Sequence, residues 1–221
     1  MTMTLRLHDY AASGNCYKVR LLLALLGREY ERVPVDIFAG DTLTEEFGRL
    51  NPVRETPVLE DDGADPLPES NAILMHLAEG TELLAADRAG RSQTLRWLFW
   101  EQSELIPALA GLRFRLMTGR LAPDAPGVER RRAEGHGVLR VLDDHLRERE
   151  FMVGGRYSVA DISLYAYVSV AHEAGFDLSG YPEIRAWLER VESTERFMND
   201  FETYPPNSQH GQSRSIYDLG I

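Results

Sequence analysis

The residues best placed for chemistry lie at the start of a predicted helix. Ser13 stands at a loop-to-helix junction, directly after the strand-like segment Leu5–His8. A helix N-terminus carries unpaired N–H groups and partial positive charge, which favour a bound anion. The Ser13 hydroxyl therefore either caps the helix or donates a hydrogen bond to a bound thiolate, and position alone leaves both interpretations open. Lowering a thiol pKa by one unit takes only ~1.4 kcal/mol, which such a site can supply.

Cys16, the single cysteine of the chain, is the rival candidate. It shares a helical face with Val19 and Leu23, so we expect its thiol to point into the core, where a thiol is inert. The alternative is a monothiol redox role, for which the chain has no Cys-x-x-Cys partner. One cysteine allows no internal disulfide, and the 6 histidines show no metal-ligand spacing, so we expect no metal site.

Two further segments have the right chemistry for binding an extended peptide. Thr56-Pro57 precedes an apolar strand, and a cis bond there would leave the Thr56 backbone to pair with a peptide ligand. Glu69-Ser70 opens a second helix. Ser70 and the helix amides could hold a carboxylate, and Glu69 could accept an ammonium, although each residue alone is also a plausible cap.

The elements that must position these residues change character near residue 80. The order before it is βαβαββα: strands at 5–8, 30–35, 56–60 and Leu67, and helices at 15–26, 42–50 and from 69 to about 80. After it the pattern is helical, including 127–149 and 158–174, and Ser158–Asp161 forms a capping box. We therefore predict domains at 1–80 and 92–202, with a linker at 81–91 and a tail at 203–221 that is loose or folds over the body.

The first helix of the second domain carries two apolar faces. One is the stripe Leu95, Leu98, Phe99, Gln102, Ile106 and Leu109, which we expect to face the core. Trp97 and Trp100 lie opposite, which indicates a second covered surface, either a subunit contact or a ligand cleft.

Composition excludes several classes of protein. The 221 residues are 43% apolar and 27% charged, which is ordinary globular usage. Lys plus Arg total 24 and Asp plus Glu total 35, giving a net charge of −11 that repels nucleic acid. Leu21–Leu26 is the longest aliphatic run, far short of the ~20 residues that span a bilayer, and the first residues show no signal peptide. We expect a cytoplasmic protein that binds neither nucleic acid nor membrane.

Four motifs together resemble the glutathione S-transferase superfamily, over the chain up to about residue 202. They are Ser13–Arg20, Asn51-Pro52 with Thr56–Leu59, Glu69–Leu74 and Ser158–Ile162. The classes they resemble are the bacterial-type serine and asparagine classes (theta-, zeta- and nu-like). The resemblance implies a thioredoxin-like N-terminal domain, an all-helical C-terminal domain and a homodimer.

The resemblance also implies roles for particular residues toward glutathione as co-substrate. Ser13 would face its thiol, with Asn15 as a second candidate thiolate donor. Glu69 and Ser70 would hold the γ-glutamyl end, and the Thr56 backbone, before a cis-Pro57, the cysteinyl part. Relatives place a lysine or glutamine near the glycyl carboxylate where this chain has Glu55, so Arg54 would substitute from the next position.

The leading hypothesis is a glutathione transferase whose bound thiolate attacks a small hydrophobic electrophile between the domains. By position, its pocket would draw on Tyr10, Phe114 and Tyr165. One alternative is a glutathione-dependent disulfide or peroxide reductase, suggested by Asn15. Another is a non-catalytic binding module that keeps the fold, for which Glu55 is the best support.

Overall fold

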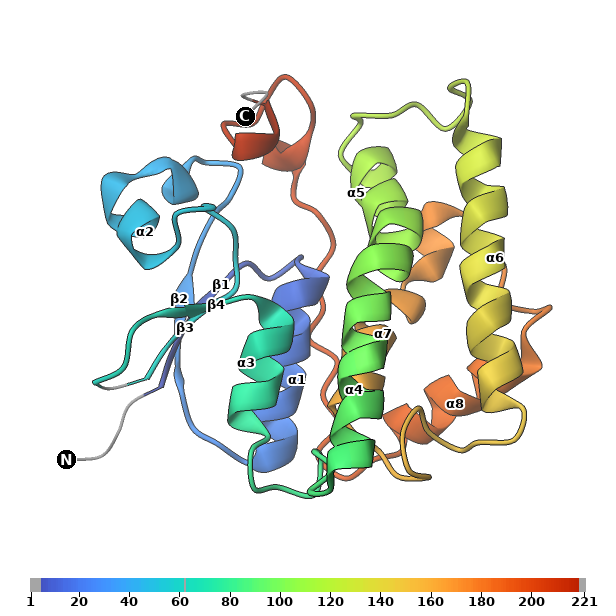
Figure 1. Ribbon diagram of the computed structural model, residues 1–221. Coiled ribbons are helices and arrows are strands. Elements are labelled where there is room, and N and C mark those ends of the chain that lie inside the picture. Colours follow the sequence, from blue (N-terminus) through green and yellow to red (C-terminus); the bar gives the residue numbers. More distant parts are fainter. Residues whose placement is uncertain (1–4, 62, 219–221) are drawn as a thin grey trace. The chain divides into compact units, whose positions relative to one another are not determined.

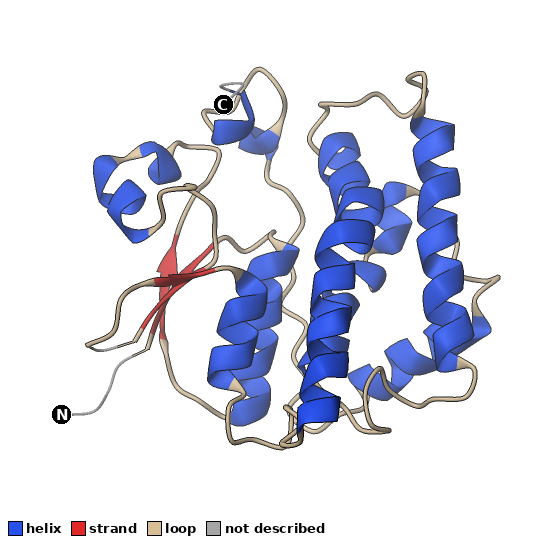
Figure 2. Cartoon of the chain, in the orientation of Figure 1, coloured by secondary structure: helices blue, strands red, loops and turns tan. Residues whose placement is uncertain are grey.

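The computed structural model describes residues 5–61 and 63–218, and these form two compact units. The first unit combines residues up to Leu77 with the segment that begins at Met198, and the second runs from Ala78 to Phe197. Figure 1 labels their elements, and Figure 2 shows strands in the first unit and helices in both. The family fold predicted from the motifs, a small mixed sheet with helices followed by a helical domain, is confirmed.

The first unit contains one four-stranded sheet with the strand order β2-β1-β3-β4. Its strands are β1 (Arg6–Asp9), β2 (Glu31–Pro34), β3 (Val58–Glu60) and β4 (Leu67–Pro68). β1 runs parallel to β2 and antiparallel to β3, and β4 runs antiparallel to β3. Leu7, Val58 and Leu59 are buried, so the central strands supply the core of this unit.

Helices α1 (Gly14–Leu26) and α3 (Ser70–Leu77) pack against each other in this unit. α1 ends where the sequence predicts, at Gly27, which adopts the left-handed conformation that a C-cap requires (φ 61°). The predicted helix over 42–50 divides into a 3₁₀ turn, η1 (Asp41–Leu43), and α2 (Glu45–Leu50), because Thr44 interrupts it as an extended N-cap.

The C-terminal segment folds onto the first unit, which is one of the two states expected for the tail at 203–221. The Tyr17 hydroxyl donates to the Met198 carbonyl at 2.8 Å, and the Tyr17 ring stacks on Phe201. Further along, the Arg214 amide donates to the Phe38 carbonyl at 2.7 Å. This segment includes the short 3₁₀ turns η4 (Pro206–Ser208) and η5 (Ile216–Asp218).

The second unit is helical throughout its regular structure. Its elements are α4 (Arg88–Trp100), a π-helical continuation η2 (Glu101–Ala110), α5 (Gly111–Met117), α6 (Val128–Leu146), α7 (Val159–Val168), η3 (Ala171–Ala174) and α8 (Pro182–Glu192). α4 begins within the predicted linker. α7 is buried at every position and packs against α4, η2 and α8, as its apolar sequence predicts. No helix among residues 5–61 and 63–218 is long and apolar enough to cross a membrane.

Two predictions for this unit need correction. In the stripe assigned to the core, Leu98 and Leu109 are buried, but Phe99 is 70% exposed and Leu95 is 39% exposed. The helix is rotated so that Trp97 faces the core, which a helical pattern with two apolar faces cannot reveal. α8 was not among the predicted helices, although Pro182 at its first position is a helix-start signal.

Asp161 holds the start of α7 from inside the second unit. Its carboxylate is fully buried and accepts hydrogen bonds from Ser158, from the Met152 amide and from the Trp187 indole. It closes the predicted capping box and also ties α7 to α8.

We predict that Asp161→Ala lowers the free energy of unfolding by about 3 kcal/mol or more, because several buried donors lose their acceptor together. Denaturant unfolding measures the change. The matched control is Asp177→Ala, which removes an acceptor for Ser179 at an exposed turn and should cost under about 1 kcal/mol. An equal decrease in the free energy of unfolding for the two variants would show that Asp161 does not stabilise the second unit through its buried hydrogen bonds.

Candidate functional site

The sheet register brings the three sequence-predicted segments to one edge of the first unit. His8 lies opposite Val58, and Val58 lies opposite Pro68. Because β3 runs antiparallel to both neighbours, the end of β1, the start of β3 and the end of β4 meet at this edge. The loop to Ser13, the Thr56-Pro57 peptide and the Glu69-Ser70 step therefore leave the sheet together.

Ser13 is the N-cap of α1. Its backbone is extended (φ −85°, ψ 123°), and its Oγ accepts a hydrogen bond from the Cys16 amide at 3.3 Å. The capping interpretation is therefore observed. It does not oppose the donor interpretation, since the cap uses an oxygen lone pair and the hydroxyl proton is a separate donor. The first turn of α1 contains no acidic residue, so nothing there offsets the positive helix end.

Asn15 and Ser70 are joined by a buried lysine. The Lys18 ammonium donates to Asn15 Oδ1 at 2.9 Å and to Ser70 Oγ at 3.4 Å. Lys18 is fully buried, Ser70 is 4% exposed and Asn15 is half-buried. A site residue on α1 and another at the start of α3 thus share one partner.

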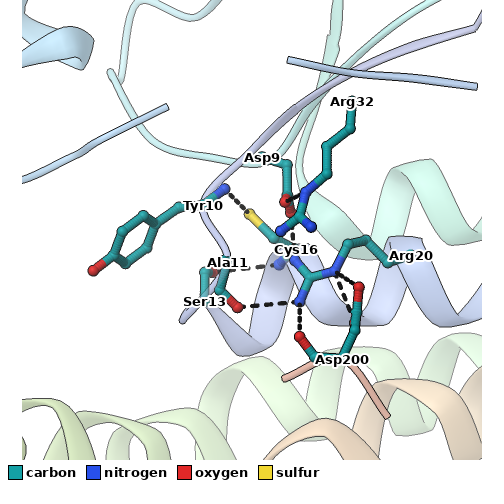
Figure 3. A network of polar contacts seen from close by, with 8 residues as sticks. All are labelled: Asp9, Tyr10, Ala11, Ser13, Cys16, Arg20, Arg32 and Asp200. Atoms are coloured by element: carbon teal, nitrogen blue, oxygen red, sulfur yellow. Dashed lines mark hydrogen bonds and ion pairs between the residues drawn. The ribbon is translucent and has the colours of Figure 1, made fainter. Parts of the chain in front are cut away.

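Cys16 is fully buried among the core residues of α1, as predicted. Burial, with a smaller contribution from the charge of Asp9, raises the pKa of its thiol to about 12. The Tyr10 amide contacts the sulfur at 3.4 Å, as Figure 3 shows. A thiol in this state is neither ionised nor accessible at neutral pH.

A network of charged residues fixes the loop that precedes α1 (Figure 3). The fully buried Arg20 guanidinium pairs with Asp9 at the end of β1 and with Asp200 of the C-terminal segment, and it donates to the Ala11 carbonyl at 3.1 Å. Arg32 of β2 holds the other oxygen of Asp9. This network therefore connects four parts of the first unit: β1, β2, α1 and the C-terminal segment.

Sequence reasoning missed the roles of Lys18 and Arg20. The signal was present: two cations occur in the apolar run of a helix whose other neighbours are core residues. A cation enters a protein interior only when it is paired, so the pattern predicts buried partners without naming them.

The Thr56–Pro57 peptide bond is cis, in agreement with the expectation from the resemblance. Arg54, two residues earlier, adopts a positive φ of 62°. Its Nη1 donates to the carbonyls of Thr42 and Thr44 at 2.8 and 2.6 Å. A Cβ on Gly48 would lie 2.6 Å from Arg54 Nη2, so a larger residue there would displace the guanidinium from its present position.

Glu69 also has a positive φ, 73°, immediately before the first residue of α3. A non-glycine residue in this region is uncommon, and such conformations cluster at ligand-binding sites. The Glu69 side chain is exposed, so its carboxylate is accessible to a ligand.

Glu55 lies close enough to Glu69 for the two carboxyl groups to interact. Burial and, to a smaller extent, the negative charge of Glu69 raise the pKa of Glu55, and a hydrogen bond with Tyr217 lowers it.

The residues expected to line a second pocket have different surroundings. Tyr10 is buried in the first unit against the rings of Phe38 and Tyr204. Phe114, on α5, lies under the Arg120 guanidinium. Tyr165 is 1% exposed, and its hydroxyl donates to Glu192 at 3.0 Å, so the structure gives it a packing role that links α7 to α8. Within residues 5–61 and 63–218, no group of three or more metal-ligating side chains is placed to hold an ion.

Comparison with known proteins agrees with this geometry. A family model of the glutathione S-transferase N-terminal domain matches residues 12–79, and one of the C-terminal domain matches residues 125–190. A glutathione S-transferase structure from Pseudomonas fluorescens Pf-5 is 42% identical, with a TM-score of 0.85, and the match covers 90% of this chain and 99% of that one.

Two other relatives carry different names. The disulfide-bond oxidoreductase YfcG of Escherichia coli K12 is 33% identical over 83% of this chain and 88% of its own. Ure2p, the yeast prion protein solved in complex with glutathione, is 25% identical, with a TM-score of 0.78 over 89% of this chain and 92% of its own.

The fold defines a thioredoxin-like unit, in which the start of α1 lies at the same sheet edge as the Thr56–Pro57 peptide and Ser70, together with a helical unit. The chain belongs to the glutathione S-transferase superfamily.

The burial of Cys16 makes the native thiol unreactive. We predict that iodoacetamide at pH 8 labels the folded protein at least about 100-fold more slowly than the denatured protein, because both access and ionisation are suppressed. Mass spectrometry after timed quenching measures the labelling. Rapid modification of the folded protein would show that the thiol is accessible and reopen a role for Cys16.

Proposed function

We propose that the protein is a glutathione transferase. Glutathione binds at the edge of the sheet in the first unit, its thiol ionises beside Ser13 and Asn15, and the thiolate attacks a small hydrophobic electrophile. The observation that carries the proposal is the meeting of Ser13, the cis Thr56–Pro57 peptide and Glu69-Ser70 at one sheet edge. Family membership and the glutathione-bound structure of Ure2p support it.

The ligand's parts match the chemistry of the individual residues. The Thr56 backbone, next to Pro57, pairs with the cysteinyl residue of glutathione. The exposed Glu69 carboxylate accepts the γ-glutamyl ammonium, and Ser70 with the first amides of α3 holds the neighbouring carboxylate. Arg54 uses Nη1 for its carbonyl contacts, so its other N–H groups are assigned to the glycyl carboxylate.

The reaction needs a thiolate and a nearby electrophilic atom. A free thiol with a pKa of about 8.5 is mostly protonated at neutral pH, and one unit of depression requires ~1.4 kcal/mol. Ser13, Asn15 and the α1 terminus favour the thiolate over the thiol, and the released proton passes to solvent. A carbon–sulfur bond to the electrophile then forms as its leaving group departs with the bonding electrons.

We predict that Ser13→Ala and Asn15→Ala each lower kcat/KM with an aryl halide by about 10- to 100-fold, the equivalent of one to two units of thiol pKa. KM for glutathione should change little, because these donors contact the sulfur. Steady-state kinetics across pH measure both. An unchanged rate in one variant would remove that residue from the mechanism.

A second candidate function is reduction of small disulfides or peroxides by two glutathiones, favoured by Asn15 and by the name of the YfcG relative. In this reaction one glutathione thiolate attacks the substrate disulfide or peroxide. With a disulfide, this attack releases one substrate thiol and leaves a mixed disulfide, and the second glutathione attacks the glutathione sulfur of that disulfide and displaces the second substrate thiol. With a peroxide, the oxygen–oxygen bond breaks to give an alcohol or water and the sulfenic acid of glutathione, from which the second glutathione displaces water. Oxidised glutathione is the product in both cases, and the two glutathiones supply the two electrons.

Both candidate reactions take their sulfur from glutathione and none from the protein. We predict that Cys16→Ala keeps at least half of whichever activity the wild-type protein shows, measured with an aryl halide and with a small disulfide. Complete loss of disulfide reduction in a folded Cys16→Ala protein would establish a monothiol mechanism. Calorimetry that detects no glutathione binding at millimolar ligand would instead favour the non-catalytic module.

We also propose that the protein is a cytoplasmic homodimer. Phe99 and Leu95 form an exposed apolar strip on α4, one turn apart, which a second copy of the chain would cover.

We predict that Phe99→Asp changes the protein from twice the chain mass to the mass of one chain in sedimentation velocity, because a carboxylate cannot be buried unpaired in an apolar contact. The control is Val141→Asp, at an equally apolar position that is 48% exposed on α6, which should stay dimeric. If both variants dissociate, or if neither does, the proposal that Leu95 and Phe99 form the dimer contact would be wrong.

A further inference from the structure

The clearest group that the proposed function leaves unexplained is the ammonium of Lys18. It is fully buried in the first unit and contacts Asn15 Oδ1 at 2.9 Å and Ser70 Oγ at 3.4 Å. Asn15 and Lys18 are three residues apart, which places both on one face of α1, and α1 packs against the helix that Ser70 begins. Placing a charged ammonium in a protein interior is costly, and these contacts offset the cost.

The chemistry of an ammonium fixes the orientation of the Asn15 amide. An ammonium has three donors and no acceptor, so the Asn15 atom that it contacts must be the carbonyl oxygen. The amide nitrogen, with its two N–H groups, is then directed away from Lys18. Ser70 is oriented by the same argument, because Lys18 uses a lone pair of its hydroxyl oxygen and leaves the hydroxyl proton as a donor.

Ser13 follows the same pattern through a different partner. Its oxygen accepts the Cys16 amide proton, so an acceptor site is again used by a donor from the protein interior. Ser13, Asn15 and Ser70 thus all have an oxygen bonded to an interior donor, and each retains protons for a ligand. Such an arrangement discriminates in favour of an anion.

We infer that Lys18 is a positioning residue that directs the amide N–H groups of Asn15 toward the thiolate of a bound ligand. The inference rests on the proposed function, since it assumes that the ligand carries a thiol. Without Lys18 the amide can rotate by 180° and present its oxygen, which repels a thiolate. The positive charge of Lys18, one side chain behind the amide, favours the thiolate further.

The test is the pKa of the glutathione thiol when bound to Lys18→Met, a substitution that keeps the length of the side chain and removes its charge. The ultraviolet absorbance of the thiolate, followed across pH at saturating glutathione, gives this pKa. We expect it to rise by about one unit relative to wild type, or about tenfold less thiolate at neutral pH. Tyr17→Phe is the control: it is on the same buried helix and loses its bond to Met198, yet should leave the thiol pKa unchanged.

A double variant separates positioning from general stability. If Lys18 acts through Asn15, adding Lys18→Met to Asn15→Ala raises the pKa of the bound thiol by much less than Lys18→Met alone. A full and additive shift in the Asn15→Ala background would overturn the inference, as would an unchanged pKa in the single Lys18→Met variant. In either case a lowered thiol pKa in wild type would keep the proposed function intact.

A second measurement uses the wild-type protein and does not depend on the folding of a variant. The side-chain amide signals of Asn15 in ¹⁵N–¹H spectra, assigned by their loss in Asn15→Ala, should shift more with glutathione than with S-methylglutathione, which has no thiolate. Equal shifts with the two ligands would overturn the inference. Failure of both ligands to bind would overturn the proposed function and the inference with it.

Discussion

The structure depends on the pairing of two cations buried within α1. A helix that buries both Lys18 and Arg20, which lie on different sides of it, is stable only where other elements supply their partners. Arg20 takes Asp9 from β1 and Asp200 from the C-terminal segment, and Lys18 takes Asn15 and Ser70. The position of the helix start, and of Ser13 with it, follows from these contacts. The same requirement accounts for the folding of the C-terminal segment onto the first unit.

This constraint also reconciles the acidic chain with a ligand of negative charge. A net charge of −11 opposes the binding of a carboxylate or thiolate at long range. At the start of α1 the charge differs from that of the chain as a whole, since its first turn has no acidic residue and the Lys18 ammonium contacts Asn15. Under the proposed function, the helix dipole and this buried cation act on the thiolate at short range, whereas exposed charges beyond about 10 Å are screened by salt.

The sequence predicted those features of the fold that depend on neighbouring residues in the chain. The Ser13 cap, the Gly27 C-cap and the buried α7 were predictable, because each depends on residues within one or two turns. The exposed side of α4 was not, since Phe99 and Trp97 are both large and apolar and only packing decides between them. The ion pair of Arg20 with Asp200 joins residues 180 positions apart, and no nearby sequence signals it. The segments that meet at the sheet edge were therefore recognisable in the sequence, and the buried charges that support them were not.

The central claim is that the reactive sulfur arrives with the ligand and ionises at the start of α1. The most direct test is a thiolate titration of glutathione bound to Cys16→Ala, because this chain contains no other cysteine and all thiolate absorbance then belongs to the ligand. The account predicts a thiol pKa at least one unit below that of free glutathione. A pKa equal to or above the free value, with glutathione fully bound, would contradict it.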